Sequence, residues 1–260
     1  MKNLVKQAYQ AADGAAQAAG VRVAMAVQTE DYHDIADLLA VIWPTGEAGH
    51  PPVEPNLLQA IGYPGNYVSA ALDGRGKVIG ACMGFFGAPA HNHHHSHIAG
   101  VLPDHEGRGI GRALKLHQRA WVLERGVTHM SWTFDPLVAR NAHFNLTRLG
   151  GRAAAFLENF YGHMSDGRNA GQESDRIMVE WELDSPAVQA LADGAAPVEP
   201  DHVGSIAVPA DIEAIRQADP EQAVKWRIAL REELQDAFDQ DLQIVGFDRH
   251  DGYLLARTPA

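Results

Sequence analysis

The chain has 260 residues, of which 46% are hydrophobic and 21% charged, and its formal net charge is −12. This length can form one large domain or two small ones, and the composition is that of an ordinary globular protein. The excess of acidic residues argues against a nucleic-acid partner, which normally needs a basic face. No apolar run has membrane-spanning length and the start of the chain lacks a signal-peptide core, so we expect a cytoplasmic protein without a membrane partner.

The single cysteine, Cys82, excludes an intrachain disulfide and agrees with a reducing compartment. It lies in the apolar stretch 80–84, where a cysteine is usually a small core residue. A nucleophilic role is the alternative interpretation.

The first half of the chain predicts helices alternating with strands. Helical spacing of alanine and leucine predicts a first helix that Gly20 ends, and Thr29 is predicted to cap the second helix. The turn at 73–76 joins two apolar strands into a hairpin. The predicted elements are a helix over 1–20, a strand over 21–27, helices over 29–42 and 57–61, and strands over 67–72, 78–86 and 98–102.

The second half continues the alternation and adds a tail. Proline- and alanine-rich residues 185–202 predict a linker. The predicted elements are a helix ended by Gly126, a strand over 128–134, a helix over 139–149, strands over 152–160 and 177–183 around a polar loop at 166–176, a strand over 203–208, helices from Pro209 and over 220–239, and strands over 242–247 and 253–256. Hairpins mixed with helical crossovers indicate an α+β fold with a partly antiparallel sheet.

A glycine-rich loop, Glu-Gly-Arg-Gly-Ile-Gly at 106–111, lies between the apolar run ending at Leu102 and a helical pattern. Glycines allow a ligand to approach closely, and the free N–H groups at a helix start point at negative charge. The loop therefore predicts a pyrophosphate site. The spacing is not the G-x-G-x-x-G of a Rossmann fingerprint, and the Gly-Lys-Ser/Thr of a Walker A loop is absent.

The loop resembles the acyl-CoA loop of the GNAT N-acyltransferase superfamily, whose pattern is Gln/Arg-x-x-Gly-x-Gly/Ala. The preceding residues 101–103 and the segment 141–150 also resemble this superfamily. The resemblance implies a GNAT fold, with a mixed central sheet flanked by helices, and acetyl-CoA or another acyl-CoA as co-substrate, with no metal. The expected domains are an N-terminal helix (1–20), a GNAT domain (21–184), a linker (185–202) and a small α/β C-terminal extension (203–260).

Further segments resemble one GNAT subgroup that has such an extension. Some of its members are encoded beside N-acylamino-acid racemases, which implies acetyl or succinyl transfer to an amino acid. The segments are His95-Ser96-His97, Trp132-Thr133-Phe134-Asp135-Pro136, Asn141-Ala142, Phe144-Asn145, Tyr161-Gly162, Ser174-Asp175-Arg176, Asp219-Pro220-Glu221, Trp226-Arg227 and Arg231-Glu232.

The resemblance also implies which residues hold the donor. In the superfamily a strand splayed from its neighbour pairs with the pantetheine arm, and a backbone N–H there polarises the thioester carbonyl; by position this strand is 98–101. The expected donor-binding residues are Ala99, Val101, Gly107, Arg108, Gly109, Ile110, Gly111, Arg112, Ala113 and Asn141. Two positions depart from the pattern. Glu106 replaces the usual Gln or Arg, and Leu146 occupies the position where many members have a tyrosine that acts as general acid toward the departing thiolate.

Amide formation needs a neutral amine, and therefore a base. A histidine suits this task, and His97 is nearest to the expected thioester site. His95, Asp135 and Glu180 are the alternatives, and a structural, hydrogen-bonding role for His97 stays open. Asn145 is expected to face the acceptor. The candidate catalytic residues are thus His97, Asp135 and Asn145.

The histidine tract 91–97 and two arginines each have a second possible interpretation. Alternate histidines of the tract 91–97, namely His93, His95 and His97, could converge on zinc, although we expect no metal because the chemistry needs none. Arg140 and Arg176 could bind an acceptor carboxylate, with surface salt bridging as the simpler interpretation.

The sequence thus predicts an N-acyltransferase that acts on a small-molecule amine or amino acid by direct attack on the thioester. A protein or peptide lysine acetyltransferase is one alternative, and a non-catalytic acyl-CoA-binding protein is another. The expected partners are the small molecule alone, with no nucleic acid and no membrane, and a homodimer is left open.

Overall fold

The computed structural model describes residues 1–45, 50–162 and 172–258, so that most of the predicted polar loop 166–176 lies outside it. The described chain forms two compact units. Unit 1 comprises residues 1–131 and 182–193, and unit 2 comprises residues 132–162, 172–181 and 194–258. Strand β5 (His129–Phe134) begins in unit 1 and ends in unit 2.

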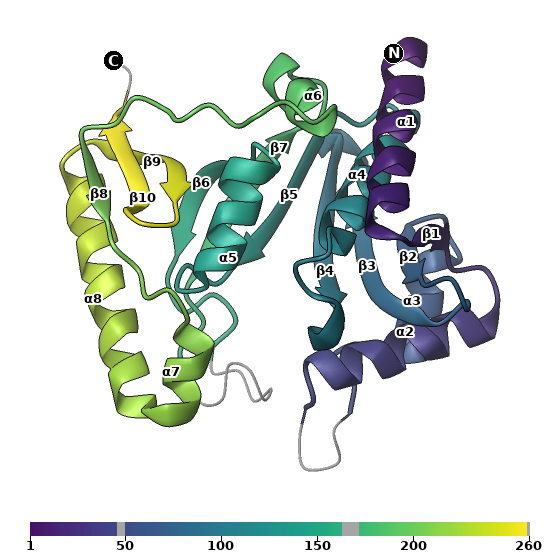
Figure 1. The fold of residues 1–260 in the computed structure, drawn as a ribbon, viewed down its shortest axis with the longest axis horizontal. Helices are drawn as coiled ribbons and strands as arrows, with labels where there is room; N and C mark the ends of the chain where they lie inside the picture. Colours follow the sequence, from purple (N-terminus) through teal and green to yellow (C-terminus); the bar gives the residue numbers. More distant parts are fainter. Residues whose placement is uncertain (46–49, 163–171, 259–260) are drawn as a thin grey trace. The chain divides into compact units, whose positions relative to one another are not determined.

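Unit 1 is built on strands that follow one another in the order β1-β2-β3-β4-β5 (Figure 1). The neighbours from β1 to β4 are antiparallel, whereas β4 and β5 are parallel. This confirms the predicted mixed sheet. The elements are α1 (Lys2–Ala19), β1 (Arg22–Met25), α2 (Thr29–Ile42), α3 (Pro55–Gly62), β2 (Tyr67–Leu72), β3 (Val78–Phe86), β4 (His93–Val101), α4 (Ile110–Glu124) and α6 (Pro186–Ala192), with short 3-10 turns at Pro89–His91 and Pro103–His105.

Helices cover both faces of this sheet. On one face, α2 and α3 bury Leu39 and Leu58 against β2 and β3. On the other, α4 packs so closely that a Cβ on Gly80 of β3 would lie 3.1 Å from Ile110 and 3.2 Å from Leu114. The sheet core therefore holds α4 firmly, and with it the loop that precedes this helix.

Unit 2 contains the rest of the chain in two sheets. Its part of the first sheet has the order β5-β7-β6, with β6 and β7 antiparallel, and the second sheet has the antiparallel order β8-β10-β9. The Tyr253 hydroxyl donates to the Pro136 carbonyl at 2.7 Å, which ties the second sheet to residues that follow β5. The elements are α5 (Ala139–Ala142), a π-helical turn (His143–Arg148), β6 (Arg152–Leu157), β7 (Arg176–Glu182), β8 (Gly204–Ile206), α7 (Ile212–Ala218), α8 (Pro220–Asp239), β9 (Leu242–Asp248) and β10 (Gly252–Arg257).

One predicted helix cap and one predicted helix start are wrong, because carboxylates accept from backbone N–H groups that the sequence reading overlooked. Gln28, not Thr29, is the N-cap of α2, and the Asp31 carboxylate accepts from the backbone N–H of Gln28 at 2.9 Å. Helix α7 begins at Ile212 rather than at Pro209, because Asp211 caps it and accepts from the Ala214 N–H at 2.9 Å.

Three further elements differ from their predictions. Strand β4 begins at His93 and not at Ile98, so residues 93–97 of the histidine tract belong to the strand. The predicted helix 139–149 changes to π-helical geometry after Ala142. The predicted linker contains α6, whose start Ser185 caps by accepting from the Val188 N–H.

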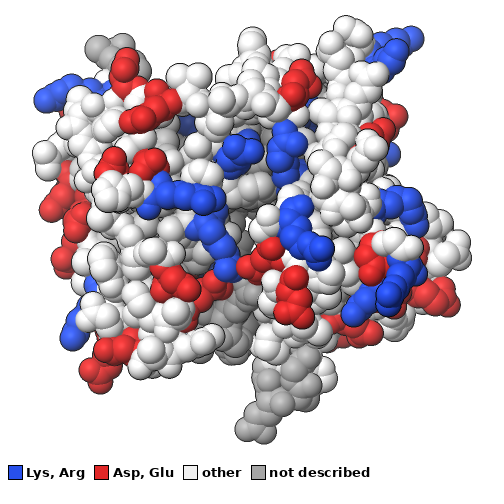
Figure 2. All heavy atoms as spheres, in the orientation of Figure 1, with Lys and Arg blue, Asp and Glu red and all other residues white. Residues whose placement is uncertain are grey.

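Acidic and basic side chains are interspersed on the face that Figure 2 draws, so the negative charge is not gathered there in one patch. In the described ranges, none of the helices combines the length and the apolar character needed to cross a bilayer.

Candidate functional site

The glycine loop forms a backbone anion cradle at the start of α4. Gly107 and Gly109 have φ angles of 74° and 85°, the left-handed region that favours glycine. Gly109 is the N-cap, and the first intrahelical bond runs from the Ala113 N–H to its carbonyl at 3.0 Å. The N–H groups of residues 110–112 therefore have no acceptor within the helix and are oriented for an anion.

The side chains of the loop contribute less than the sequence suggested. The Arg112 guanidinium donates to the Leu191 and Ala192 carbonyls at the end of α6, both at 2.9 Å. Arg108 is exposed and contacts the His105 ring at 3.1 Å. The Ile110 side chain is buried in the core, and the Ala113 N–H is used by the helix. The side chains of Ile110, Arg112 and Ala113 are therefore not available to contact a ligand at the loop. These residues contribute to the loop through the position of their backbone.

Strand β4 has a bulge and a partly unpaired edge. Gly84 of β3 pairs with Ser96 and Met83 pairs with Ile98, so His97 is the extra residue. Strand β4 pairs with β5 at residues 93–95 and 129–131. Beyond His95, the described strands of unit 1 pair with β4 only through β3, where Ala99 lies opposite Cys82 and Val101 opposite Gly80. The other edge of residues 96–101 presents backbone groups that an extended ligand arm could pair with.

Two histidines lie on one side of β4 beside Phe85. The rings of His95 and His97 are 6.1 Å apart, and each is within 6.0 Å of the Phe85 ring. Burial lowers the pKa of His97, and burial together with His97 lowers the pKa of His95 to about 4. Both rings are therefore neutral at pH 7 and able to accept a proton, and His97 is the more exposed of the two.

The histidine tract shows no sign of the alternative zinc site. His93 and His95 instead contact the Ser131 hydroxyl, at 2.8 and 3.4 Å. Across the described ranges, no three His, Cys, Asp or Glu residues are placed to hold a metal ion.

Asp135 is buried in an ion cluster, a setting that does not favour its predicted role as a base. Its Oδ2 accepts from Arg216 at 2.6 Å and from Arg227 at 2.8 Å, and its Oδ1 accepts from the Leu137 N–H. Burial alone would raise the pKa of Asp135, but the guanidinium groups of Arg227 and Arg216 hold it well below its usual range. Such a carboxylate has little affinity for a proton.

Asn145 and Glu180 also have structural partners. The Asn145 amide oxygen accepts from the Trp132 indole N–H at 3.1 Å, and both side chains are buried. This bond gives Asn145 a structural role, and its expected contact with an acceptor stays a prediction. Glu180 forms an exposed salt bridge with Arg152. Asn141 is half-buried at the start of α5, and its donor-binding role remains a prediction.

The cluster around Asp135 extends to residues that sequence reasoning did not connect. Arg231 of α8 donates to both carboxylate oxygens of Asp175, at 3.0 and 2.7 Å. Arg176 lies over the Tyr161 ring at 5.4 Å, and Arg140 pairs with Glu213 at 2.8 Å. Residues within 174–176 and 226–232 resemble those of the GNAT subgroup. Their opposite charges could have indicated this cluster, because buried charges need partners of opposite sign.

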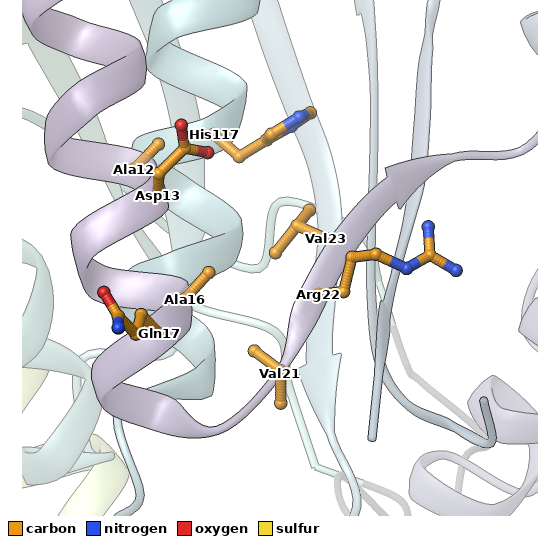
Figure 3. Close-up of a pocket in the computed structure, with 8 residues that line it drawn as sticks. All are labelled: Ala12, Asp13, Ala16, Gln17, Val21, Arg22, Val23 and His117. Atoms are coloured by element: carbon orange, nitrogen blue, oxygen red, sulfur yellow. The ribbon is translucent and has the colours of Figure 1, made fainter. Parts of the chain in front are cut away.

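Unit 1 also has a separate pocket of about 340 Å³ between α1, β1 and α4 (Figure 3). Asp13 and His117 contribute polar side chains to it, and the His117 Nδ1 contacts the Tyr67 hydroxyl at 2.8 Å. None of the predicted donor-binding or catalytic residues lines this pocket.

Comparisons with known proteins concern the family and the fold. A sequence profile of the Acetyltransferase (GNAT) family matches residues 32–150. The ribosomal-protein-S18-alanine N-acetyltransferase from Escherichia coli is similar in structure, with 15% identity and a TM-score of 0.51 over 64% of this chain and 95% of that one. An N-acetyltransferase from Staphylococcus aureus Mu50 has 16% identity and a TM-score of 0.51 over 63% of this chain and 99% of that one.

The ribosomal-protein-S5-alanine acetyltransferase from Vibrio fischeri gives the same picture, with 16% identity and a TM-score of 0.51 over 64% of this chain and 94% of that one. At these identities the likeness concerns the fold alone. No protein with a curated description matches the sequence.

Proposed function

We propose that this chain, whose residues 32–150 match the profile of the GNAT acetyltransferase family, moves an acetyl or succinyl group from CoA to the amino group of a small molecule, with an amino acid as the acceptor. One observation carries the proposal: the N–H cradle at the start of α4 and the unpaired edge of β4 belong to the same unit. Such a pair suits a pyrophosphate with an extended arm.

In this proposal, different groups of the chain bind the donor, stabilise the developing negative charge and remove the proton of the amine. The N–H groups at 110–112 bind the pyrophosphate, while backbone groups of Ala99 and Val101 pair with the pantetheine. The bulge at His97 supplies the backbone that faces the thioester oxygen, where negative charge develops. His97 takes the proton of the attacking amine.

The departing thiolate needs no acid from the helix. Leu146 is buried and apolar, so it has no proton to give. A thiol has an ordinary pKa of about 8.5, so the thiolate leaves readily and water can protonate it. We further propose that residues 21–184 supply the transferase site and that the extension at 203–260 shapes the acceptor side.

Thiol release tests the proposed reaction. The protein is mixed with acetyl-CoA or succinyl-CoA and a panel of amino acids, and freed CoA is titrated. We expect thiol above the hydrolysis background with at least one pair. A panel of lysine-containing peptides is run in parallel, and turnover of peptides alone would contradict the small-molecule acceptor. Acyl-CoA that raises the melting temperature without any thiol release would indicate a binding protein instead.

Replacing His97 by glutamine is expected to lower kcat about 100-fold, because the amine then loses its base. Burial lowers the pKa of His97, so in the unmodified protein the acid limb of kcat/KM rises with pH and levels off below neutrality. H97Q should lose this limb. The exposed His91 provides the matched control, and H91Q should keep both the rate and the limb. An unchanged pH profile in H97Q would refute the assignment.

A further inference from the structure

Lys115 of α4 is a buried lysine whose surroundings call for an explanation. It is 4% exposed, and lysine is almost never buried to this extent unless its ammonium group has partners. The ammonium group donates to the Ser96 hydroxyl at 3.0 Å and to the Gln118 amide oxygen at 3.2 Å, and lies 3.8 Å from the Met130 sulfur. These three partners are uncharged, and burial weakens the screening of the lysine charge by water.

The same hydrogen bonds hold β4 directly before its bulge. The Ser96 hydroxyl donates to the Gln118 amide oxygen at 2.9 Å, and the Gln118 amide nitrogen contacts His94 at 3.3 Å. Ser96 immediately precedes His97, the extra residue of the bulge. Gly84 opposite Ser96 leaves the room for this network, because a Cβ there would lie 2.5 Å from His94 and 2.9 Å from Gln118.

Among the titratable groups around it, Lys115 is the one that changes charge near pH 8. Burial lowers the pKa of Lys115 to about 8, so the ammonium form predominates at pH 7. Burial raises the pKa of Cys82 on β3 and, much further, that of Tyr67 on β2. Burial lowers the pKa of His94 to about 3 and that of His95 to about 4. Between pH 7 and 9 these four groups therefore stay neutral.

We propose that Lys115 is a positioning residue for acyl transfer: it fixes the β4 bulge through Ser96 and directs a positive charge at the oxygen that becomes negative beside this bulge. This inference rests on the proposed function and names a residue that the resemblance did not imply. The amine nitrogen forms the C–N bond, the carbonyl electron pair moves to oxygen, and the C–S bond breaks when that pair returns. Lys115 keeps its proton throughout, so its contribution is electrostatic.

Kinetics of two substitutions separate charge from packing. Lys115→Met keeps an unbranched apolar stem and removes the charge, and it should lower kcat about tenfold or more with the KM for acyl-CoA changed less than twofold. Lys115→Arg keeps the charge and should retain most of the rate. In the unmodified protein kcat should fall as pH rises through about 8, because neutral lysine keeps its hydrogen bonds but not its charge. K115M should lack this fall, and the exposed-lysine control K77M should behave like the unmodified protein.

Infrared spectroscopy tests the same charge without turnover. The probe is acetyl-CoA with a ¹³C-labelled carbonyl, whose stretching frequency should drop on binding and return toward the free value in K115M. In the unmodified protein the drop should shrink between pH 7 and 9.5. A frequency that is the same with and without the charge overturns the proposal, as does loss of acyl-CoA affinity in K115M, which would make Lys115 a part of the donor site's structure.

The outcomes also separate this inference from the proposed acceptor. A lysine-dependent carbonyl shift without turnover of any amine would support Lys115 and contradict the amine acceptor. Turnover of an amine together with a carbonyl shift that does not depend on Lys115 would support the amine acceptor and contradict the role of Lys115. A protein that binds no acyl-CoA would contradict both. If K115M does not fold, the pH dependence in the unmodified protein and the behaviour of K115R decide the matter.

Discussion

Replacing Asp135 by alanine is expected to destabilise the protein by about 3–5 kcal/mol, the range found when one partner of a buried ion pair is removed. The carboxylate is shared by two guanidinium groups, and Arg227 is itself buried, so the substitution leaves positive charge in the interior without its counter-charge. Urea unfolding, followed by circular dichroism, measures the loss as a lower midpoint concentration.

The exposed pair of Arg152 and Glu180 provides the control. Both side chains are largely open to water, so Glu180→Ala should change the free energy of unfolding by less than about 1 kcal/mol. Combining Asp135→Leu with Arg227→Met should recover part of the stability, because the more deeply buried of the two guanidinium charges is then absent as well. If D135A were as stable as the unmodified protein while its kcat collapsed, Asp135 would act in catalysis after all and the ion cluster would not explain it.

Replacing Gly109 by valine is expected to weaken acyl-CoA binding between about tenfold and 100-fold. Gly109 has a φ of 85°, and a left-handed conformation costs other residues roughly 1–2 kcal/mol, with more for a β-branched side chain. The backbone then relaxes away from the cradle, and the N–H groups at 110–112 lose their common direction. Isothermal titration with CoA measures the change directly.

Gly76 is a matched control for this substitution. It has a φ of 82° and lies in the hairpin turn between β2 and β3, where a Cβ would meet open space. Gly76→Val should therefore carry a similar backbone strain but leave CoA affinity within about twofold. Equal losses of affinity in G76V and G109V would show that general destabilisation, and not the cradle, controls binding.

The parts of the fold that sequence predicted well depend on neighbouring residues alone. Strands 67–72 and 78–86 were predicted with their observed ends, because apolar runs flank an Asp-Gly turn. Helix α8 was also predicted with its observed ends, since Asp219 caps it and a proline occupies its first turn. The glycine loop belongs to the same class, because its conformation is set by glycines within four residues.

The features of the fold and of the candidate site that the sequence did not predict depend on contacts between residues far apart in the chain. His93 opens a strand although histidine gives little strand signal, because the side chains of α4 satisfy the polar residues of β4. Asp135 looked like a candidate base because its partners, Arg216 and Arg227, come 81 and 92 residues later. Lys115 looked like one of several basic residues near the loop, and only the folded sheet shows that it is buried.

The bond between Arg112 and α6 limits where the chain can be shortened. Residues 186–192 follow the last strand of the matched fold, yet their final carbonyls are acceptors for an arginine in the first turn of α4. A chain cut after residue 184, at the boundary that composition suggested, would strip those acceptors from the helix that forms the cradle. Any shortened version of the chain should therefore keep the segment through Asp193, because this short helix supplies the acceptors that hold the Arg112 side chain.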